Sequence, residues 1–367
     1  MRISFLTLSL RQRGGGSHQN AILFIRALRG HGHAVSVFTL GDDDDPPHDI
    51  TVHNVKDGSG AFSATLKSRA RIMKGLETQT DVFLAYGHAL LWAAGLYRMQ
   101  GTKPVAVYID SHLDSMKEQH RFSLIHRLKH RAWELVRGRA LARGVDLIIA
   151  VSPYLKGRLI RAGFPTSKIS VIPNSFDLIP PVSRIKNSPS IRVLYAGRLS
   201  PEKGVDILID AFSQLPTDVS AFLRIVGSGA ERDALQEQTR LRAISNKVGF
   251  AGWMSREDLA DEYAAADVVV VPSRVPEPFG RTVVEALNAG VPVIVPEGSG
   301  AAWVADSAGV TFARGDAASL TGALTKVISD RTLRQALGER GRARARDFAV
   351  QIVGVQLAHS LEAILSS

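Results

Sequence analysis

The stretch VPEPFGRTVVEALNAGVPVIV, residues 275–295, decides how the second half of the chain folds. Its central part, RTVVEALNAG, spaces its apolar residues as an amphipathic helix does, and Gly290 stands where such a helix ends. The apolar runs on either side, ADVVVVPS at 266–273 and VPVIV at 291–295, predict buried strands. A buried strand, a helix and a second buried strand in this order indicate a parallel sheet covered by helices.

The same stretch carries two carboxylates at the seam between strand and helix. Glu277 lies in the loop after the first strand, and Glu285 falls near the second turn of the helix. Ligands of parallel α/β sheets bind outside the carboxyl ends of the strands, and the first N–H groups of the helix, at residues 280–282, can bind an anion. We therefore expect the carboxylates to accept hydrogen bonds from sugar and ribose hydroxyls. The alternative is that both acids only complement the helix dipole.

A second loop, within YAGRLSPEKGVDILIDAF at 195–212, carries two cations. Arg198 follows a strand, and Lys203 comes just before Gly204 and a helix. Two cations beside a helix N-terminus oppose the helix dipole. An anion such as a diphosphate between them would stabilise the arrangement. A solvated basic loop is the alternative.

A third loop, Gly14–Gly16, follows a strand at 2–10 and precedes a helix that Ser17 is expected to cap. Glycines let the backbone approach a phosphate closely, and the start of the helix supplies N–H donors. The dinucleotide-binding fingerprint requires a glycine at position 19, where this chain has Gln19. A simple tight turn therefore stays an equal alternative to a phosphate-binding loop.

Length and pattern together predict two domains. The 367 residues are 45% apolar, which is enough for a large core and too long for one ordinary domain. Strands alternate with helices in both halves, so we expect an α/β protein with two doubly wound, Rossmann-like domains that face each other across a cleft. The expected boundaries are an N-terminal domain at 1–177, a Pro- and Ser-rich linker at 178–190, and a C-terminal domain at 191–367 whose final helix packs back on the N-terminal domain.

The rest of the sequence predicts further strands and helices. Further strands are expected at 33–40, 81–87, 103–110, 145–152, 169–173, 191–197, 220–229 and 247–252, and a helical tail is expected after residue 295.

The chain has no cysteine, which excludes a disulfide or a cysteine zinc site and is typical of a reducing, cytoplasmic location. GDDDDPP at 41–47 is expected to form an exposed turn and no metal site, because four consecutive acids cannot all reach one ion.

The excess positive charge is confined to the first half of the chain. Residues 1–180 hold 24 Lys and Arg against 14 Asp and Glu, whereas residues 181–367 hold 21 of each. Residues 117–144 hold eight Lys and Arg and space their apolar residues as a helix does. We expect this basic helix to contact anionic lipid headgroups at the inner membrane face or an acidic acceptor, with an ordinary surface helix as the alternative. Nucleic acid is not expected, because the helix lacks interleaved aromatic residues.

Several of these pieces together resemble family 4 glycosyltransferases, which are retaining enzymes of the two-Rossmann GT-B fold. GRLSPEKG, IVGSG, FAGWMSREDLADEYAAADVVVVPS and EPFGRTVVEALNAGVPVIV stand in the order that this family shows. VDLIIAVSPYLKGRLIRAGFPTSKISVIPNSFD at 145–177 resembles the family's run into its interdomain linker. The resemblance covers most of residues 140–300. Before residue 140 it is limited to the glycine loop and the strand pattern.

The resemblance implies a role for each residue that matches the family's motifs. Arg198 and Lys203 would bind the diphosphate of the donor and stabilise the leaving group. Glu277 would bind hydroxyls of the donor sugar, and Glu285 would bind the ribose of the nucleotide. Further contacts to the donor would come from Gly15, Gly16, Gly227, Phe279, Gly280, Arg281 and Thr282. The family uses no essential metal, so no metal or other cofactor is expected.

The chain departs from the family at the end of the strand at 103–110. The family usually has a histidine there, near the reacting sugar, whereas this chain has Asp110, with His112 two residues on. Asp110 and His112 are therefore both candidates for the catalytic neighbour of the sugar. Two other departures leave the donor residues intact: Ser175-Phe176 stands in place of Gly-Val, and Trp303 in place of Glu.

The resemblance implies transfer of a hexose-type sugar from a UDP- or GDP-sugar to an acceptor hydroxyl, with retention at the anomeric carbon. The resemblance also implies that the C-terminal domain binds the nucleotide sugar and that the N-terminal domain binds the acceptor. The acceptor is expected to be a sugar or a lipid-linked glycan, as in the synthesis of cell-surface polysaccharide. Two alternatives stay open. One is a non-catalytic module that binds a nucleotide or phosphosugar, and the other is a glycoside hydrolase, whose paired carboxylates must face the bond from opposite sides.

Overall fold

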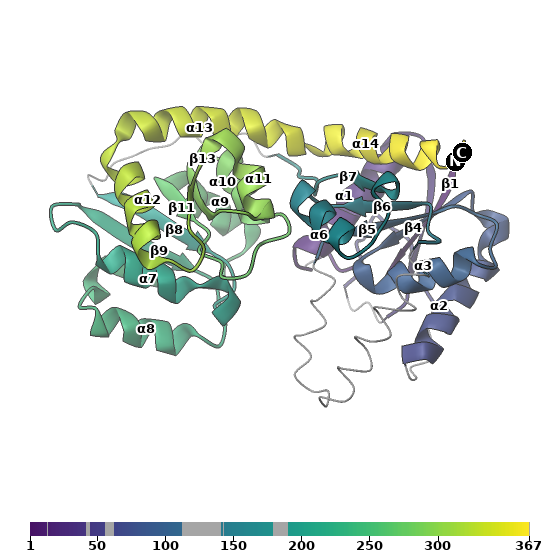
Figure 1. The fold of residues 1–367 in the computed structure, drawn as a ribbon, viewed down its shortest axis with the longest axis horizontal. Helices are drawn as coiled ribbons and strands as arrows, with labels where there is room; N and C mark the ends of the chain where they lie inside the picture. The colour runs from purple at the N-terminus through teal and green to yellow at the C-terminus, as the bar shows by residue number, and fades with distance from the viewer. Residues whose placement is uncertain are drawn as a thin grey trace. The chain divides into compact units, whose positions relative to one another are not determined.

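The structure is a computed structural model that describes residues 1–12, 14–41, 45–55, 62–111, 141, 143–178 and 190–366. The chain divides into two compact units, which are drawn in Figure 1. Unit 1 comprises Met1–Asp177 and Ala349–Ser367, and unit 2 comprises Leu178–Phe348. Each unit is built on its own parallel sheet covered by helices, which confirms the predicted α/β fold class.

The sheet of unit 1 has seven strands in the order β3-β2-β1-β4-β5-β6-β7, and every neighbouring pair is parallel. Its strands are β1 (Arg2–Thr7), β2 (Ala34–Thr39), β3 (Val52–Asn54), β4 (Val82–Tyr86), β5 (Val105–Ile109), β6 (Leu147–Ala150) and β7 (Ile169–Val171). Strands β4, β5 and β6 are buried at every position, as continuous apolar runs predict. The strand order reverses between β1 and β4, and ligands bind at such a switch point.

Among the described residues, the helices of unit 1 are α1 (Gly16–Gly30), α2 (Phe62–Gly75), α3 (Leu91–Arg98), α6 (Pro153–Arg161) and α14 (Val350–Ala363). Helix α14 packs along α1. Gly354 approaches so closely that a Cβ atom there would lie 2.6 Å from the Cβ of Ala27. Phe176 and Ala349 form a parallel bridge just before α14. The C-terminal segment is therefore part of unit 1.

The sheet of unit 2 has six strands in the order β10-β9-β8-β11-β12-β13, again all parallel. Its strands are β8 (Ile191–Ala196), β9 (Ala221–Val226), β10 (Val248–Gly252), β11 (Val268–Val270), β12 (Val293–Pro296) and β13 (Gly309–Phe312). Its helices are α7 (Val205–Ser213), α8 (Arg232–Leu241), α9 (Arg256–Ala265), α10 (Arg281–Asn288), α11 (Gly300–Ala305), α12 (Ala317–Ser329) and α13 (Arg331–Ala345). Here the strand order reverses between β8 and β11.

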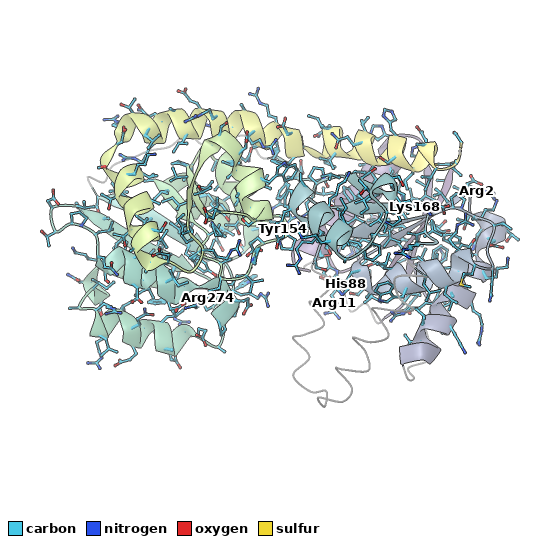
Figure 2. All side chains as sticks on the ribbon, viewed as in Figure 1. Arg2, Arg11, His88, Tyr154, Lys168 and Arg274 are labelled. Carbon is cyan, nitrogen blue, oxygen red and sulfur yellow. The ribbon has the colours of Figure 1, made fainter. Side chains whose placement is uncertain are left out.

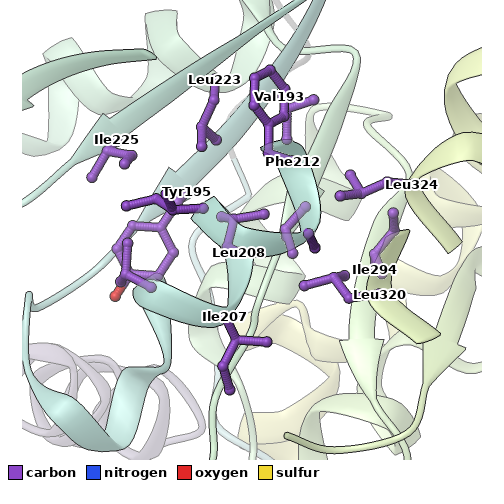
Figure 3. Packing of buried hydrophobic residues seen from close by; sticks show 14 of the residues in the cluster. Val193, Tyr195, Ile207, Leu208, Phe212, Leu223, Ile225, Ile294, Leu320 and Leu324 are labelled. Carbon is purple, nitrogen blue, oxygen red and sulfur yellow. The ribbon is translucent and has the colours of Figure 1, made fainter. Parts of the chain in front are cut away.

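One buried cluster of unit 2 lies between the sheet and the helices α7 and α12. Figure 3 shows Val193 and Tyr195 of β8 packed with Leu208 and Phe212 of α7 in this cluster. Burying one such side chain contributes roughly 1.5–3 kcal/mol relative to leaving it exposed. This cluster therefore fixes the end of β8, from which the loop with Arg198 leaves.

Short 3-10 helices connect several elements: η1 (Glu77–Gln79), η2 (His88–Leu90), η5 (Thr166–Lys168), η6 (Pro201–Lys203), η7 (Ser245–Lys247), η8 (Asp306–Ala308) and η9 (Arg346–Phe348). None of the helices in the described ranges is long and apolar enough to cross a bilayer. The same residues contain no group of three His, Asp or Glu side chains that could hold a metal ion.

The structure corrects three details of the sequence analysis. Ser17 does not cap α1, because the N-cap is Gly15, which makes no side-chain capping bond. The tail after residue 295 is not wholly helical, since it includes β13, and strand β3 was not predicted. Both strands are short and carry exposed positions, so their sequences lack the buried apolar run that marks the other strands.

Some sequence predictions concern residues outside the described ranges. These are His112, nearly all of the basic stretch 117–144, the acids of GDDDDPP at 42–44, and the linker interior at 179–189.

Candidate functional site

Arg198 lies in the loop that follows β8. The hydroxyl of Tyr195 donates a hydrogen bond of 2.6 Å to the carbonyl oxygen of Arg198 and so fixes the backbone of the loop. The Arg198 side chain is 69% exposed, and its Nη2 lies 3.7 Å from Oε1 of Glu202. The guanidinium thus extends from a fixed backbone position and stays accessible to a ligand.

Gly227, at the end of β9, brings a second backbone segment against this loop. Its φ is +136°, and a Cβ atom there would lie 1.8 Å from the carbonyl oxygen of Gly197. Only glycine therefore allows the ends of β8 and β9 to approach this closely. The arrangement explains the glycine at this position without any contact to a ligand.

Lys203 and Glu277 form an ion pair at the switch point of the unit 2 sheet. Nζ of Lys203 donates to Oε1 of Glu277 at 2.6 Å, and the hydroxyl of Ser273 donates to the same oxygen at 2.8 Å. The side chains of Lys203 and Glu277 are 24% and 19% exposed. Oε2 of Glu277 accepts no hydrogen bond from the part of the chain that the structure describes. One oxygen therefore positions the carboxylate, and the other is available to a ligand.

The loops that carry this pair are joined to each other. The backbone N–H of Arg274 donates to the carbonyl oxygen of Glu202 at 2.9 Å. The guanidinium of Arg274 pairs with Asp206 at the start of α7 and also contacts the carbonyl oxygen of Pro201. The loop after β8 and the loop after β11 are thus held together at the sheet edge. The positions of Lys203 and Glu277 relative to each other are therefore fixed.

The charge of Glu202 is also set by this loop. Burial raises the pKa of its carboxyl, but the hydrogen bond from Ser200 and the charges of Arg198 and Lys203 outweigh burial, and the pKa lies below its ordinary value. The loop after β8 therefore balances its cations with an ionised acid.

The start of α10 lies next to Glu277 along the chain. Gly280 is the N-cap, with φ +102°, and no side chain caps the helix. The backbone N–H of Gly300 donates to the carbonyl oxygen of Glu277 at 2.7 Å and holds the preceding loop. Thr282 Oγ1 lies 3.5 Å from the carbonyl oxygen of Ala196, which places the first turn of α10 against the end of β8. Arg281 begins this turn.

Glu285 lies one turn further along α10 and is held by Tyr263 of α9. The Tyr263 hydroxyl donates to Oε2 of Glu285 at 2.9 Å. Burial and the negative charge of Glu285 raise the pKa of Tyr263 well above its ordinary value, so the phenol stays protonated. Oε1 of Glu285 accepts no hydrogen bond from the described residues. Like Glu277, Glu285 has one oxygen fixed and one available.

The side chain of Phe279 packs inward. It is 2% exposed and lies 6.2 Å from the ring of Trp303 and 5.5 Å from the ring of Phe348. The Arg344 guanidinium stacks 4.8 Å from the Phe348 ring and 5.2 Å from the Trp303 ring. The Phe279 side chain therefore anchors the loop, and its backbone is the part that could reach a ligand. Trp303 belongs to the same aromatic cluster.

In unit 1, the glycine loop follows β1 at the corresponding switch point, and Asp110 follows β5, two strands away in the sheet. Gly15 caps α1, and Gly16 is its first residue. Ser17 donates a short hydrogen bond to Oδ2 of Asp110, which follows β5, and the Tyr86 hydroxyl lies 3.5 Å from the same oxygen. The hydroxyl of Ser17 is thus used to orient Asp110 and is not available to cap the helix.

A pocket of about 220 Å³ opens beside Asp110. His88 follows β4 and lines it, with Nδ1 2.8 Å from the hydroxyl of Ser111. Figure 2 labels His88 within unit 1. Burial lowers the pKa of His88 below its ordinary value, and the nearby charge of Asp110 opposes this only in part. The imidazole is therefore neutral at pH 7.

The structure thus brings the predicted residues together within each unit. Arg198, Lys203, Glu277 and the first turn of α10 share one edge of unit 2, and Glu285 lies on the next turn of α10. Four residues at these sites were not predicted from the sequence: Ser273, Tyr263, His88 and Ser111. The sequence held a weak signal for them: Ser273, His88 and Ser111 come at or shortly after the ends of predicted strands, and Tyr263 lies on the helix before β11.

Two family models match the chain. The model described as Glycosyl transferases group 1 matches residues 181–344, and the model described as Glycosyltransferase Family 4 matches residues 14–179. Together they account for nearly the whole sequence. The chain belongs to glycosyltransferase family 4. The resemblance that the motifs indicated is confirmed.

Relatives with assigned names match this chain over part of its length. A mannosylfructose-phosphate synthase of Agrobacterium fabrum is 33% identical over 194 residues, which are 47% of this chain and 41% of that protein. The lipopolysaccharide core biosynthesis glycosyltransferase LpsE of Rhizobium meliloti is 32% identical over 206 residues, 54% of this chain and 58% of that protein. The matches thus span about half the length of these relatives.

Solved structures of the same fold match over the full length. A sucrose-phosphate synthase from Thermosynechococcus elongatus superposes with a TM-score of 0.81 at 24% identity, covering 100% of this chain and 99% of its own. Anabaena HepE, solved in complex with UDP and glucose, superposes with a TM-score of 0.77 at 24% identity, covering 99% and 100%. At this identity the likeness establishes the fold, which is the predicted two-domain GT-B fold.

Proposed function

We propose that this family 4 protein transfers a hexose-type sugar, with retention, from a UDP- or GDP-sugar to an acceptor hydroxyl. The observation that carries the proposal is the Lys203–Glu277 ion pair, held by Ser273 at the switch point of the unit 2 sheet. The accessible Arg198 guanidinium and the start of α10, which no side chain caps, lie at the same edge of the sheet. Two cations and the N-terminus of a helix can bind a diphosphate. A carboxylate with one available oxygen can accept a hydrogen bond from a hydroxyl of the attached sugar.

In this proposal the two cations and the helix stabilise the leaving group. Negative charge builds on the departing diphosphate, and groups fixed in advance stabilise that charge without reorganisation. Arg198 supplies an accessible fork of donors, and Lys203 supplies a compact charge held by Glu277. Backbone groups of Gly280, Arg281 and Thr282 complete the anion site. No metal is required in this scheme.

The carboxylates position the donor and do not transfer its proton. Glu277 would accept from a sugar hydroxyl through Oε2 while Lys203 and Ser273 hold Oε1. Glu285 would accept from a ribose hydroxyl through Oε1 while Tyr263 holds Oε2. Both acids are held in place by hydrogen-bond donors of neighbouring residues. Gly227, Phe279, Gly15 and Gly16 would contribute backbone contacts.

Retention follows from a same-face route in which the leaving phosphate helps to deprotonate the acceptor. The proposal assigns no covalent nucleophile. Asp110 and His112 stay the proposed neighbours of the reacting sugar, and the hydrogen bond from Ser17 gives Asp110 a fixed orientation. Comparing the anomeric configuration of donor and product by NMR tests the retention directly.

The two rival functions are less well supported. A glycoside hydrolase needs one carboxylic acid that donates a proton, whereas Glu277 and Glu285 both accept hydrogen bonds from fixed donors. A non-catalytic nucleotide-binding module would use the same donor site. Release of free nucleoside diphosphate from a nucleotide sugar separates that module from an enzyme.

The acceptor is proposed to be a sugar or lipid-linked glycan at the inner face of the cytoplasmic membrane. The excess of Lys and Arg in residues 1–180 favours an anionic surface. A match to a lipopolysaccharide core glycosyltransferase of Rhizobium meliloti supports a role in cell-surface polysaccharide. No nucleic-acid partner is proposed.

A panel of UDP-, GDP- and ADP-sugars tests the donor site. We expect one nucleotide class to raise the melting temperature and to release nucleoside diphosphate slowly. Lys203→Met should abolish the shift, whereas Lys326→Met, which removes an exposed lysine of α12, should retain it. If no nucleotide sugar shifts the melting temperature of the wild type, the proposed function is wrong.

A further inference from the structure

Arg344 lies in the last turn of α13 and uses all three guanidinium nitrogens as donors. Nε donates to the carbonyl oxygen of Val304 at 3.2 Å, Nη2 to that of Trp303 at 3.0 Å, and Nη1 to the carboxylate of Asp347 at 2.8 Å. The two carbonyl groups belong to the last turn of α11, where helix carbonyls lack partners within the helix. Arg344 therefore caps the C-terminus of α11 with a charged donor.

The other end of α11 holds the loop that carries Glu277. The backbone N–H of Gly300, the first residue of α11, donates to the carbonyl oxygen of Glu277 at 2.7 Å. A Cβ atom on Gly300 would lie 1.9 Å from the carbonyl oxygen of Pro278, so the loop lies directly against the start of the helix. Helix α11 thus contacts the loop of Glu277 with one end and Arg344 with the other.

Arg344 is also linked to this loop through aromatic rings. Its guanidinium lies 5.2 Å from the ring of Trp303 and 4.8 Å from the ring of Phe348, within the range of a cation–π interaction. These two rings lie 6.2 Å and 5.5 Å from the ring of Phe279, which stands two residues after Glu277. Two separate routes therefore lead from Arg344 to the loop, one through α11 and one through the rings.

We infer that Arg344 is a positioning residue for Glu277. Lys203 and Ser273 restrain one carboxylate oxygen of Glu277, whereas Arg344 restrains the backbone from which its side chain starts. Residues that contact a substrate need such support from the packing and hydrogen bonds behind them. Arg344 acts through α11 and the rings, and it is assigned no contact with the donor. The inference rests on the proposed function, in which Glu277 binds a hydroxyl of the donor sugar.

A second arginine of α13 provides a matched control. Nη1 of Arg334 donates to the carbonyl oxygen of Val327 at 2.9 Å and to that of Ile328, so Arg334 caps the C-terminus of α12 as Arg344 caps that of α11. Helix α12 packs on α7 and β13. Arg334→Ala therefore measures what the loss of a capping arginine from α13 does to stability, without the link to the loop of Glu277.

Hydrogen exchange on the full chain tests the link without any ligand. In Arg344→Ala, the peptide 297–304, which contains the Gly300 amide, should exchange about fivefold faster, because the helix that carries this amide loses its cap. In Arg334→Ala, the same peptide should exchange as in the wild type, and the faster exchange should lie at the end of α12.

Calorimetric titration then tests the effect on the sugar. The probes are UDP-glucose with UDP and GDP-mannose with GDP, and the quantity compared is the Kd of the diphosphate divided by the Kd of its nucleotide sugar. We expect Arg344→Ala to lower this ratio about fivefold for a donor that the wild type binds, because the hydrogen bond from the sugar to Glu277 is weakened. Arg334→Ala should leave the ratio unchanged, since a loss of stability alone does not distinguish a sugar from its absence.

Arg344→Lys supplies a conservative variant and replaces the alanine variant if that one does not fold. Its cation can still donate to one of the two carbonyl oxygens, so its Kd ratio should lie between those of the wild type and Arg344→Ala.

Two results would overturn the inference. One is wild-type exchange of 297–304 or a wild-type Kd ratio in both Arg344 variants, and the other is an equal fall of the ratio in Arg334→Ala. A wild type that binds a nucleotide sugar while the ratio stays constant refutes the inference alone. A wild type that binds neither UDP-glucose nor GDP-mannose, nor any other sugar of the donor panel, refutes the proposed function and the inference together.

Discussion

The roles proposed for Glu277 and Glu285 depend on the residues that donate hydrogen bonds to their carboxylates. Each has one carboxylate oxygen bound by a neighbour and one that the described residues leave to a ligand. The sequence pattern predicted that both acids lie at one sheet edge. It did not predict that Ser273 and Tyr263 donate hydrogen bonds to them. Hydrogen bonds between residues that lie far apart in sequence depend on packing, which no local pattern encodes.

Tyr263→Phe should weaken nucleotide binding without unfolding the protein. Removing the hydroxyl leaves Glu285 without its fixed donor, and a net hydrogen bond contributes about 1 kcal/mol, or roughly a fivefold change in Kd. Calorimetric titration with UDP and GDP measures the effect. Tyr97→Phe removes an equivalent bond to Glu77 in unit 1 and should leave the Kd unchanged. Equal affinities of Tyr263→Phe and wild type would show that Glu285 needs no positioning.

Glu77 gives a prediction about pH. Burial opposes its ionisation, but hydrogen bonds from Lys74, Tyr97 and the backbone of Thr102 outweigh burial and lower its pKa from 4.5 to about 2. The folded pKa is depressed, so the stabilisation is complete above pH 4.5 and is lost as the pH falls toward 2.

Glu77→Gln should therefore lower stability at pH 7 by about 1–3 kcal/mol. The unfolding free energies of variant and wild type should converge as the pH falls below 4.5. Urea unfolding at pH 7, 4.5 and 3 checks both statements. A constant difference at all three values would contradict the assignment.

At the scale of the elements, the strands and helices around the opening stretch followed from sequence patterns. The run at 266–273, the helix at 281–290 and the run at 291–295 became β11, α10 and β12. The N-cap of α1 was predicted wrongly, because Ser17 bonds to Asp110, 93 positions away. Short strands with exposed positions, such as β3, carry too little pattern to be recognised.

Gly227→Ala tests the contact between the ends of β8 and β9. A Cβ atom would collide with the carbonyl oxygen of Gly197 in a backbone conformation that costs L-residues about 1–3 kcal/mol. We expect a lower melting temperature and weaker nucleotide binding, because the loop of Arg198 must shift.

Gly322→Ala is the matched control for that variant. Gly322 lies in α12 with no atom within 4 Å of a Cβ, so alanine should stabilise the helix by about 0.5–1 kcal/mol. If the two variants have the same stability and the same nucleotide affinity, the close approach at Gly227 has no structural importance.

At the scale of the molecule, the C-terminal helix α14 belongs to unit 1 although the preceding helix α13 belongs to unit 2. It packs on α1, which carries the glycine loop at its start. The stability of the unit 1 pocket therefore depends on residues at the far end of the sequence.

Gly354→Leu should loosen α1 and α14 and leave unit 2 unchanged. A leucine there collides with Ala27, and such overpacking costs about 1–3 kcal/mol. Hydrogen exchange resolves the two units separately and should show faster exchange in both helices. Gly75→Leu, at an exposed position with open space around it, should leave exchange in α1 and α14 unchanged. Faster exchange confined to unit 2 would contradict the assignment of α14.

The central claim is that unit 2 binds a nucleoside-diphosphate sugar and stabilises its leaving diphosphate through Arg198. Single-turnover release of nucleoside diphosphate by Arg198→Ala, compared with Arg240→Ala, tests it most directly. Both side chains are 69% exposed and pair with a nearby glutamate, so neither change should alter the melting temperature. We predict that Arg198→Ala slows release by roughly 10²–10³-fold and that Arg240→Ala does not. Wild-type turnover in Arg198→Ala would contradict the account.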